Sequence, residues 1–281
     1  MSDLPPSSTI GIFDSGVGGL SVLRAIRELR GDVNIFYVAD QAHVPYGPRP
    51  LEQVRGFATA ITEYLLGERA ELITVACNAA SAAALYSLRE SFPEVPFVGM
   101  EPALKPAATL SGSGTVGVLA TPATFQGELY ASVLERFAAS VTVLTSTCPG
   151  LVQRIEAGDL DGPDTRAILE EALCPMLDAG ADTIVLGCTH YPFVIPLIQL
   201  IAGPGVKVID PSPAVARQAD RLLKEARPAA KIADGLSAGR VQLCTTGDPA
   251  AFSKLSAALF GESNPVSQLA WNKGALCQVE M

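Results

Sequence analysis

The chain has 281 residues, of which 48% are hydrophobic, enough to bury the core of two modest α/β domains or one large one. Its net charge of −9, from 20 Lys and Arg against 29 Asp and Glu, disfavours nucleic acid or an anionic membrane as a partner. The N-terminus lacks a basic segment followed by an apolar run, and no stretch reaches the roughly 18 apolar residues of a membrane span. We therefore expect a cytoplasmic protein that binds neither nucleic acid nor membrane, with a homodimer as the default assembly.

Six cysteines are scattered along the chain without a Cys-x-x-Cys pair, at positions 77, 148, 174, 188, 244 and 277. This spacing fits neither a disulfide framework nor a zinc-ribbon pattern. We expect reduced thiols and no metal site. Because most free cysteines are small hydrophobic core residues, a functional role has to be argued for individual positions.

Short strand-like runs alternate with longer helical segments. In the first hundred residues we expect strands at 9–13, 34–39 and 72–76, and helices at 18–29, 51–66 and 78–90. The pattern resumes with strands at 115–120, 141–145 and 182–188, each followed by a helix. This alternation predicts βαβ units, a mainly parallel sheet and the α/β fold class.

A third stretch continues the pattern with a strand at 206–210, a helix at 211–226, and the segment 243–252 followed by a further helix. The last 20 residues show no clear period, so we expect only a packed tail around Trp271. Prolines and an SGSG run place a domain boundary between Gly99 and Gly114. The stretch from about Val206 fits either domain.

Polar and reactive residues concentrate at the ends of the expected strands, where open parallel sheets bind their ligands. They are Asp14-Ser15-Gly16, Asp40, Cys77-Asn78, Cys188-Thr189-His190 and Asp210.

The segment GIFDSGVGG first suggests a dinucleotide-binding turn, with Asp40 about 26 residues further on. The pattern would need a third glycine where Ser21 stands, and Asp14 would place a carboxylate beside the pyrophosphate. A tight strand-to-helix turn explains the glycines but does not require Asp14. We therefore disfavour a nucleotide site.

Cys77 and Cys188 occupy equivalent positions, each after a hydrophobic strand and before a helix. Backbone N–H groups and the helix dipole at such a position are expected to lower the pKa of a thiol towards neutrality. Either cysteine alone would be a core residue in most proteins, but two in equivalent places favour a shared chemical role.

His190 lies two residues after Cys188 and admits three interpretations. A metal site lacks two further ligands at suitable spacing, and a hydrolytic Cys–His pair would leave Cys77 unexplained. We favour a His190 that assists proton transfer at Cys188 or binds a carboxylate. The loop from Asp40 to Pro48 is either a structural turn or, as its place after a strand favours, a substrate-contacting loop.

Two thiols of similar pKa, one deprotonated and one protonated, can remove a proton from one face of a carbon and return one to the other face. Such a pair suits a racemase. The carbanionic intermediate would be stabilised by donors aimed at a carboxylate, for which the backbone and side chains near Ser15, Asn78 and Thr189 are suitable. No cofactor is expected, because none of the six lysines follows a strand as a pyridoxal lysine would.

Five segments, in order, resemble glutamate racemase: GIFDSGVGGLSV (11–22), VADQAHVPYG (38–47), VACNAAS (75–81), LGCTHYP (186–192) and TTGDPAAF (245–252). The resemblance implies two similar α/β domains with the active site between them, the first formed by residues 1–100 plus 207–281 and the second by 101–206. It implies cofactor-independent interconversion of L- and D-glutamate, which supplies D-glutamate for peptidoglycan.

The resemblance also implies roles for individual residues. Cys77 would remove the proton from D-glutamate with the assistance of Asp14, and Cys188 would remove it from L-glutamate. Glu156, which would otherwise be taken for a surface helix residue, would act with His190 beside Cys188.

The substrate contacts that the resemblance implies are Asp14, Ser15, Tyr46, Gly47, Asn78, Thr189, His190 and the position of Ala79. The family usually has Thr where this chain has Ala79, and the missing hydroxyl would weaken binding by about 1 kcal/mol. Gln41 and His43 also differ from the commoner residues of their loop. Two alternatives stay open: an aspartate racemase or related enzyme acting on another acid, and a binding protein that has lost turnover.

Overall fold

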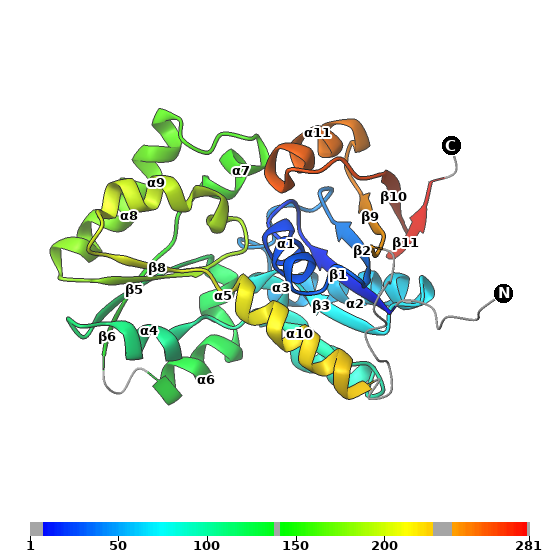
Figure 1. The fold of residues 1–281 in the computed structure, drawn as a ribbon, viewed down its shortest axis with the longest axis horizontal. Helices are drawn as coiled ribbons and strands as arrows, with labels where there is room; N and C mark the ends of the chain where they lie inside the picture. The colour runs from blue at the N-terminus through cyan, green and yellow to red at the C-terminus, as the bar shows by residue number, and fades with distance from the viewer. Residues whose placement is uncertain (1–7, 138–140, 227–237, 280–281) are drawn as a thin grey trace.

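The computed structural model describes residues 8–137, 141–226 and 238–279. Two groups of elements lie side by side, each built on its own sheet (Figure 1). Strand order in the first sheet is β11-β10-β9-β2-β1-β3-β4, and in the second it is β6-β5-β7-β8. The predicted architecture of two similar α/β domains with mainly parallel sheets is confirmed.

The strands of the first sheet are β1 (Thr9–Asp14), β2 (Asn34–Ala39), β3 (Leu72–Val75), β4 (Phe97–Gly99), β9 (Val241–Thr245), β10 (Val266–Asn272) and β11 (Ala275–Gln278). Their helices are α1 (Leu20–Leu29), α2 (Leu51–Gly67), α3 (Asn78–Ser91), α10 (Ser212–Ala226) and α11 (Pro249–Phe260). The strands of the second sheet are β5 (Thr115–Ala120), β6 (Thr142–Ser146), β7 (Thr183–Gly187) and β8 (Lys207–Ile209). Their helices are α4 (Leu104–Leu110), α5 (Pro122–Gln126), α6 (Glu128–Phe137), α7 (Leu151–Glu156), α8 (Pro163–Asp178), the 3-10 helix η2 (Tyr191–Val194) and α9 (Ile195–Ala202).

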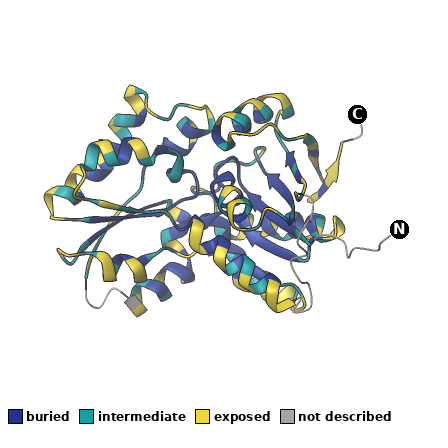
Figure 2. Ribbon diagram, viewed as in Figure 1, coloured by how far each residue is buried: buried dark blue, intermediate teal, exposed yellow. Residues whose placement is uncertain are grey.

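The central strands of both sheets are buried over nearly their whole length, as the near-continuous hydrophobic runs of β1, β3, β5 and β7 require. Helices cover both faces of a parallel sheet, so its strands have no solvent-facing side. Figure 2 shows these strands in dark blue, with exposed residues on the outer sides of the helices. The largest hydrophobic cluster includes residues from both sheets, such as Ile12 and Leu186. The two domains therefore share a continuous core.

The parallel strands bring the reactive residues to one edge of each sheet. In the first sheet β1 pairs in parallel with both β2 and β3, so that Asp14, at the end of β1, lies opposite Ala39. In the second, β5 pairs in parallel with β7, and Ala120 lies opposite Gly187. Cys77 follows β3 after one intervening residue, Ala76, and Cys188 follows β7 directly, so both lie at the carboxyl ends of their sheets.

Sheet membership corrects one predicted boundary. The first domain was expected to resume at residue 207, but β8 pairs in parallel with β7 and belongs to the second sheet. Helix α10 then packs along α1 and also contacts β3 and β4. We therefore propose that the chain crosses between the domains at 210–211. The sequence did not reveal this boundary, because the pattern of β8 fits either sheet and does not by itself identify the partner strand.

The C-terminal segment is also more ordered than the expected tail. β10 pairs in parallel with β9, and β11 forms an antiparallel hairpin with β10. Within this hairpin, the indole Nε1 of Trp271 donates a hydrogen bond to Oδ1 of the fully buried Asp40, at 2.7 Å. The hairpin thus anchors the loop that follows β2.

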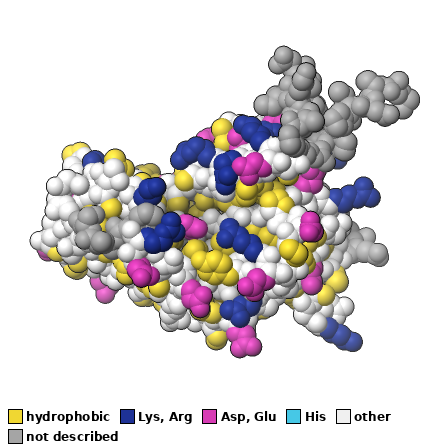
Figure 3. Space-filling view, turned by 90° about the horizontal axis from the view of Figure 1, so that it is seen from below, with side chains coloured by type: hydrophobic (Ala, Val, Ile, Leu, Met, Phe, Trp, Pro, Cys, Tyr) yellow, Lys and Arg dark blue, Asp and Glu magenta, His cyan; other side chains and the backbone are white. Residues whose placement is uncertain are grey.

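None of the helices within the described ranges combines the length and apolarity needed to cross a membrane. On the face drawn in Figure 3, Lys and Arg side chains alternate with Asp and Glu, with hydrophobic side chains between them. The described part of that face therefore offers no continuous basic surface.

Replacing Trp271 tests the anchoring of this loop. Trp271→Phe keeps the aromatic packing but removes the donor to a buried carboxylate, so the free energy of unfolding should fall by about 2 kcal/mol. Urea denaturation measures the change. The neighbouring Asn272→Ala, in the same exposed hairpin, should change it by less than about 0.5 kcal/mol; equal losses in both variants would contradict the anchoring role.

Candidate functional site

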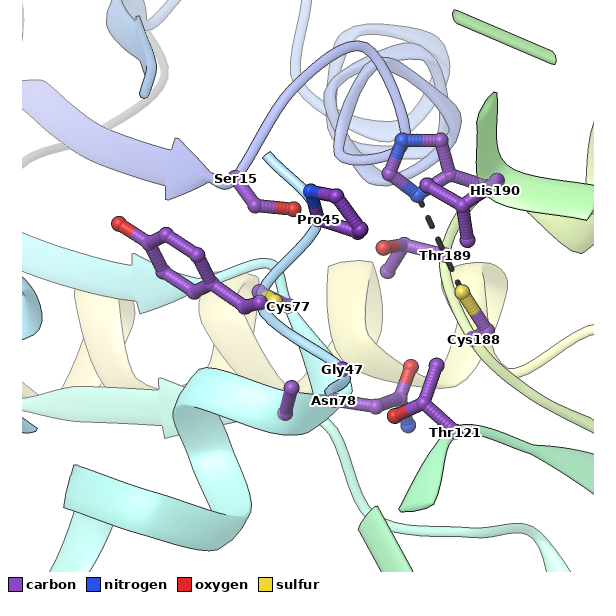
Figure 4. Close-up of a pocket in the computed structure, with 12 residues that line it drawn as sticks. Ser15, Pro45, Gly47, Cys77, Asn78, Thr121, Cys188, Thr189 and His190 are labelled. Atoms are coloured by element: carbon purple, nitrogen blue, oxygen red, sulfur yellow. Dashed lines mark hydrogen bonds between the residues drawn. The ribbon is translucent and has the colours of Figure 1, made fainter. Parts of the chain in front are cut away.

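Both candidate thiols line a single small pocket between the two sheets. Cys77 occupies the N-cap position of α3, and Cys188 follows β7. They reach the pocket from opposite sides, Cys77 with the first sheet and Cys188 with the second (Figure 4). The other residues lining it are Ser15, Pro45, Tyr46, Gly47, Asn78, Ala79, Thr121, Val152, Thr189 and His190. A small molecule in this pocket would have one sulfur on either side.

Asp14 is fully buried beside Cys77. Its Oδ2 accepts the N–H groups of Gly16 at 3.2 Å and Gly19 at 3.0 Å. Its Oδ1 accepts the hydroxyl of Thr189, from the other sheet, at 3.4 Å. Burial raises the pKa of Asp14 even though the His190 charge and the Cys77 hydrogen bond lower it.

The environment of Cys77 corrects one expectation. A helix N-terminus was expected to lower the pKa of this thiol, but burial, followed by the charge of Asp14, raises its pKa well above the usual value. The backbone contact with Ala80 acts in the lowering direction and is the weaker effect. Desolvation of a thiolate therefore outweighs the helix N-terminus at this position.

Cys188 lies beside a chain of hydrogen bonds that crosses the domain interface. Its sulfur is 3.9 Å from His190 Nδ1, and His190 Nε2 is 2.6 Å from Glu156 Oε1. The same carboxylate oxygen accepts the backbone N–H of Val17, from the first domain, at 2.7 Å. Glu156 therefore connects the second thiol to both domains.

The charged forms of His190 and Glu156 stabilise each other. Burial alone lowers the pKa of His190, but its hydrogen bonds with Cys188 and Glu156, together with the charges of Asp14 and Glu156, raise it well above the usual value. Burial alone raises the pKa of Glu156, and its hydrogen bond and ion pair with His190 reverse this and lower it. Both ring nitrogens of an imidazolium donate, one to Glu156 and the other to the Cys188 sulfur.

The glycines of GIFDSGVGG have a structural explanation that involves no nucleotide. A Cβ at Gly16 would collide with the carboxylate of Glu156, and a Cβ at Gly18 would collide with the imidazole of His190. Glycine at both positions lets the Glu156–His190 pair of the second domain approach the backbone of the first.

The loop after β2 is held in place by hydrogen bonds and also forms part of the pocket wall. Asp40 holds the loop by accepting hydrogen bonds from the Tyr46 hydroxyl at 2.6 Å and the Thr246 hydroxyl at 2.8 Å. His43 also hydrogen-bonds to Asp40, at 2.8 Å, and stacks on Phe57. The loop held in this way places Tyr46 and Gly47 in the pocket wall.

Asn78 is 3% exposed, and neither its side-chain oxygen nor its side-chain nitrogen has a hydrogen-bond partner among the described residues. A buried, unpaired amide costs free energy, so a partner supplied by a ligand would satisfy it. Its neighbour Ala79 lines the pocket with a methyl group and offers no hydrogen bond.

Sequence reasoning missed two pocket residues, Thr121 and Val152, and named a third, Pro45, only as part of the loop from Asp40 to Pro48. Thr121 directly follows β5, so the rule that drew attention to the other strand ends could have found it. Conversely, Asp40 and Asp210 follow strands but do not line the pocket. Asp210 instead accepts the backbone N–H of Ser212 at the start of α10, at 2.8 Å.

Among the described residues, no group of three or more His, Cys, Asp or Glu side chains is arranged to hold a metal ion. The residues that line the pocket include no lysine, which a pyridoxal cofactor would need for its Schiff base. The titratable side chains that line the pocket are Cys77, Cys188, His190 and Tyr46. Asp14 and Glu156 interact with Cys77 and His190 but do not themselves line the pocket.

Comparison with known proteins defines the class. Residues 10–219 match the model of the Asp/Glu/hydantoin racemase family. A glutamate racemase from Roseiflexus sp. (strain RS-1) is 50% identical over 246 residues, which cover 88% of this chain and 90% of that protein. The chain therefore belongs to the Asp/Glu/hydantoin racemase family and is an isomerase of the amino-acid racemase class.

Solved structures agree, and they confirm the resemblance to glutamate racemase. A glutamate racemase isoform from Bacillus anthracis superimposes with a TM-score of 0.84 at 30% identity, covering 95% of this chain and 98% of that one. A glutamate racemase from Francisella tularensis, solved with D-glutamate, gives a TM-score of 0.80 at 27% identity, covering 94% and 98%.

Gly16→Ala tests the close approach of Glu156. The added methyl group would displace the carboxylate from His190, and racemase turnover should fall about tenfold or more, a change of about 1.4 kcal/mol in the barrier. Turnover and the free energy of unfolding should be measured together. Gly56→Ala, in the exposed part of α2 with nothing near its Cβ position, should leave turnover unchanged. Full turnover in Gly16→Ala would show that the contact is dispensable.

The pKa shifts of the buried pair predict how stability depends on pH. Because the pKa of Glu156 is lowered, its contribution is present above about pH 4.3 and is lost as pH falls through the lowered value. Because the pKa of His190 is raised, its contribution is complete below about pH 6.5 and is lost as pH rises through the raised value.

Glu156→Gln should therefore cost most stability between about pH 4.3 and 6.5, by about 3 kcal/mol, and less on either side. Urea denaturation across pH measures the difference between the protein and this variant. Glu170→Gln, which removes an exposed ion pair with Arg166, serves as the control and should cost less than about 1 kcal/mol. A cost in Glu156→Gln that does not vary with pH would contradict the charged pair.

Proposed function

We propose that the protein interconverts L- and D-glutamate by a two-base mechanism that needs no cofactor, with Cys77 and Cys188 as the acid/base thiols. The observation that carries the proposal is the pair of thiols on opposite sides of one pocket, each with its own ionisable partner. Racemisation requires this arrangement, because a proton must leave one face of Cα and another must arrive at the opposite face.

In the direction from L-glutamate, the Cys188 thiolate takes the Cα proton and the Cys77 thiol donates its proton to the opposite face. From D-glutamate the roles reverse. The raised pKa of Cys77 keeps this group protonated near neutral pH before substrate binds, which suits a proton donor. For the reverse direction, the ammonium group of the substrate would offset the charge of Asp14 and so make the thiolate of Cys77 more accessible.

Removal of the Cα proton needs donors that stabilise the developing negative charge. The amide of Asn78, whose polar atoms have no partner in the described structure, would bind the substrate carboxylate. Ser15 and Thr189 line the same pocket with hydroxyl groups. The positive charge held on His190 by Glu156 adds an electrostatic contribution close to the reacting carbon.

Glutamate is proposed as the substrate because of the relatives, since one solved homologue holds D-glutamate. Ala79 removes one hydroxyl from the pocket relative to the family pattern, while Thr121 supplies a hydroxyl from the second domain. We further propose that the D-glutamate product supplies peptidoglycan synthesis in the cytoplasm. The homodimer stays a prediction.

Proton NMR of L-glutamate and, separately, D-glutamate in D2O tests the proposal directly, using the purified protein without added cofactor. We expect the Cα–H signal of both enantiomers to disappear as racemic product accumulates. Cys77→Ser and Cys188→Ser should each slow racemisation at least about a hundredfold, since the pKa of a hydroxyl is far above that of a thiol, so serine is almost never ionised to act as the base and is a poorer proton donor. Cys174→Ser, an exposed cysteine outside the pocket, is the matched control.

Two outcomes would replace the proposal. Exchange of aspartate or another acid, without exchange of glutamate, would keep the chemistry and change the substrate. No exchange of any amino acid would favour a binding protein that has lost turnover.

A further inference from the structure

Gln41 contacts the Glu156–His190 pair from the first domain. It follows β2, and its side-chain Nε2 donates to Glu156 Oε2 at 3.0 Å. The other carboxylate oxygen, Oε1, already accepts from His190 and Val17. Gln41 therefore donates to the carboxylate oxygen that does not accept from His190 or Val17, so both oxygens of Glu156 accept hydrogen bonds.

The orientation of the Gln41 amide is set by Thr245, at the end of β9. The Thr245 hydroxyl accepts the backbone N–H of Gly247 at 3.0 Å and donates to Gln41 Oε1 at 2.8 Å. An ionised carboxylate can only accept hydrogen bonds, so the amide nitrogen must face Glu156, which leaves the amide oxygen for Thr245. Both contacts require the same amide orientation.

Packing restricts the same side chain. Thr245 is fully buried, and a Cβ at Gly247 would lie 2.9 Å from the Cβ of Gln41. The side chain of Glu156 is 11% exposed, and the short helix α7 ends at this residue. Without Gln41, the Oε2 atom of Glu156 would lose its side-chain donor, and the carboxylate could turn away from His190.

We propose that Gln41, oriented by Thr245, is a positioning residue that acts mainly on one of the two bases: it fixes Glu156 so that His190 serves proton transfer at Cys188. This inference rests on the two-thiol mechanism proposed above. In each direction the proton moves between Cα and the Cys188 sulfur, and Gln41 itself neither gains nor loses a proton.

The contacts explain why the effect of Gln41 falls mainly on one thiol. Asp14, the partner of Cys77, takes its hydrogen bonds from Gly16, Gly19 and Thr189. Among the described residues, the hydrogen-bond donors to Asp14 and the neighbours that shift the pKa of Cys77 include neither Gln41 nor Thr245. His190 and Glu156 act on Asp14 through their charges, whereas His190 hydrogen-bonds to the Cys188 sulfur directly. Loss of Gln41 should therefore slow the transfer at Cys188 more than the transfer at Cys77.

Values of kcat/KM cannot reveal which of the two proton transfers a variant slows. Two enantiomers have equal free energies in water, so the equilibrium constant is one and any variant must change kcat/KM equally in both directions. Isotope effects separate the steps, because glutamate deuterated at Cα reports how far proton abstraction limits the rate. For the L enantiomer that abstraction is the work of Cys188, and for the D enantiomer it is the work of Cys77.

The experiment compares the deuterium isotope effects on kcat/KM for L- and D-glutamate in the protein and in Gln41→Leu. We expect kcat/KM to fall about tenfold in both directions, the scale of one hydrogen bond to a charged group. The isotope effect should rise for L-glutamate and fall for D-glutamate. Thr245→Val should shift the isotope effects in the same way, and Thr245→Ser, which keeps the hydroxyl, should restore them.

Gln268→Leu is the matched control, because this exposed glutamine also contacts Gly247 but does not reach Glu156; its isotope effects should equal those of the unchanged protein. Isotope effects that keep their ratio in Gln41→Leu and Thr245→Val, whether or not the rate falls, would overturn the positioning role. If the unchanged protein does not racemise glutamate, the proposed function has failed instead.

Discussion

The carboxylate of Glu156 is the contact on which the geometry of the site depends. It belongs to the second domain, yet it accepts the backbone N–H of Val17 from the first while it binds His190 of its own. The glycines of the first domain leave room for it. One side of the proton-transfer machinery is therefore complete only when the two domains meet, which couples folding of the interface to the chemistry proposed for it.

The shared core packs the two domains against each other, and burial is the first influence on the pKa values of the site. Desolvation is the largest single effect on the pKa of Cys77, Asp14, Glu156 and His190, and specific partners then decide the outcome. Glu156 and His190 each have a strong partner of opposite charge, and their pKa values shift in the directions that favour the charged forms. Cys77 has no such partner among the neighbours that shift its pKa, and the raised pKa favours its neutral form. The two thiols thus lie in different environments, although they occupy equivalent positions in their sheets.

Local pattern predicted the strands that alternate with long helices, though not β4, β10 or β11, and the strand-end rule identified both thiols, because hydrophobic periodicity and chain order are properties of the sequence itself. Which strands pair with each other, and how deeply a side chain is buried, are not properties of the local sequence. The direction of the Cys77 pKa, the sheet to which β8 belongs and the β10–β11 hairpin all depend on contacts between segments distant in the chain. Glu156 shows the same limit: only resemblance pointed to it, since nothing in LVQRIE distinguishes a site residue from a surface one.

The most direct measurement of the central claim is a crystal structure of the protein with bound glutamate. The account predicts that Cα lies about 3.5 Å from the sulfurs of both Cys77 and Cys188, on opposite faces, with the substrate carboxylate on the amide of Asn78. Glutamate bound with only one sulfur near Cα, or bound outside this pocket, would contradict a two-base mechanism.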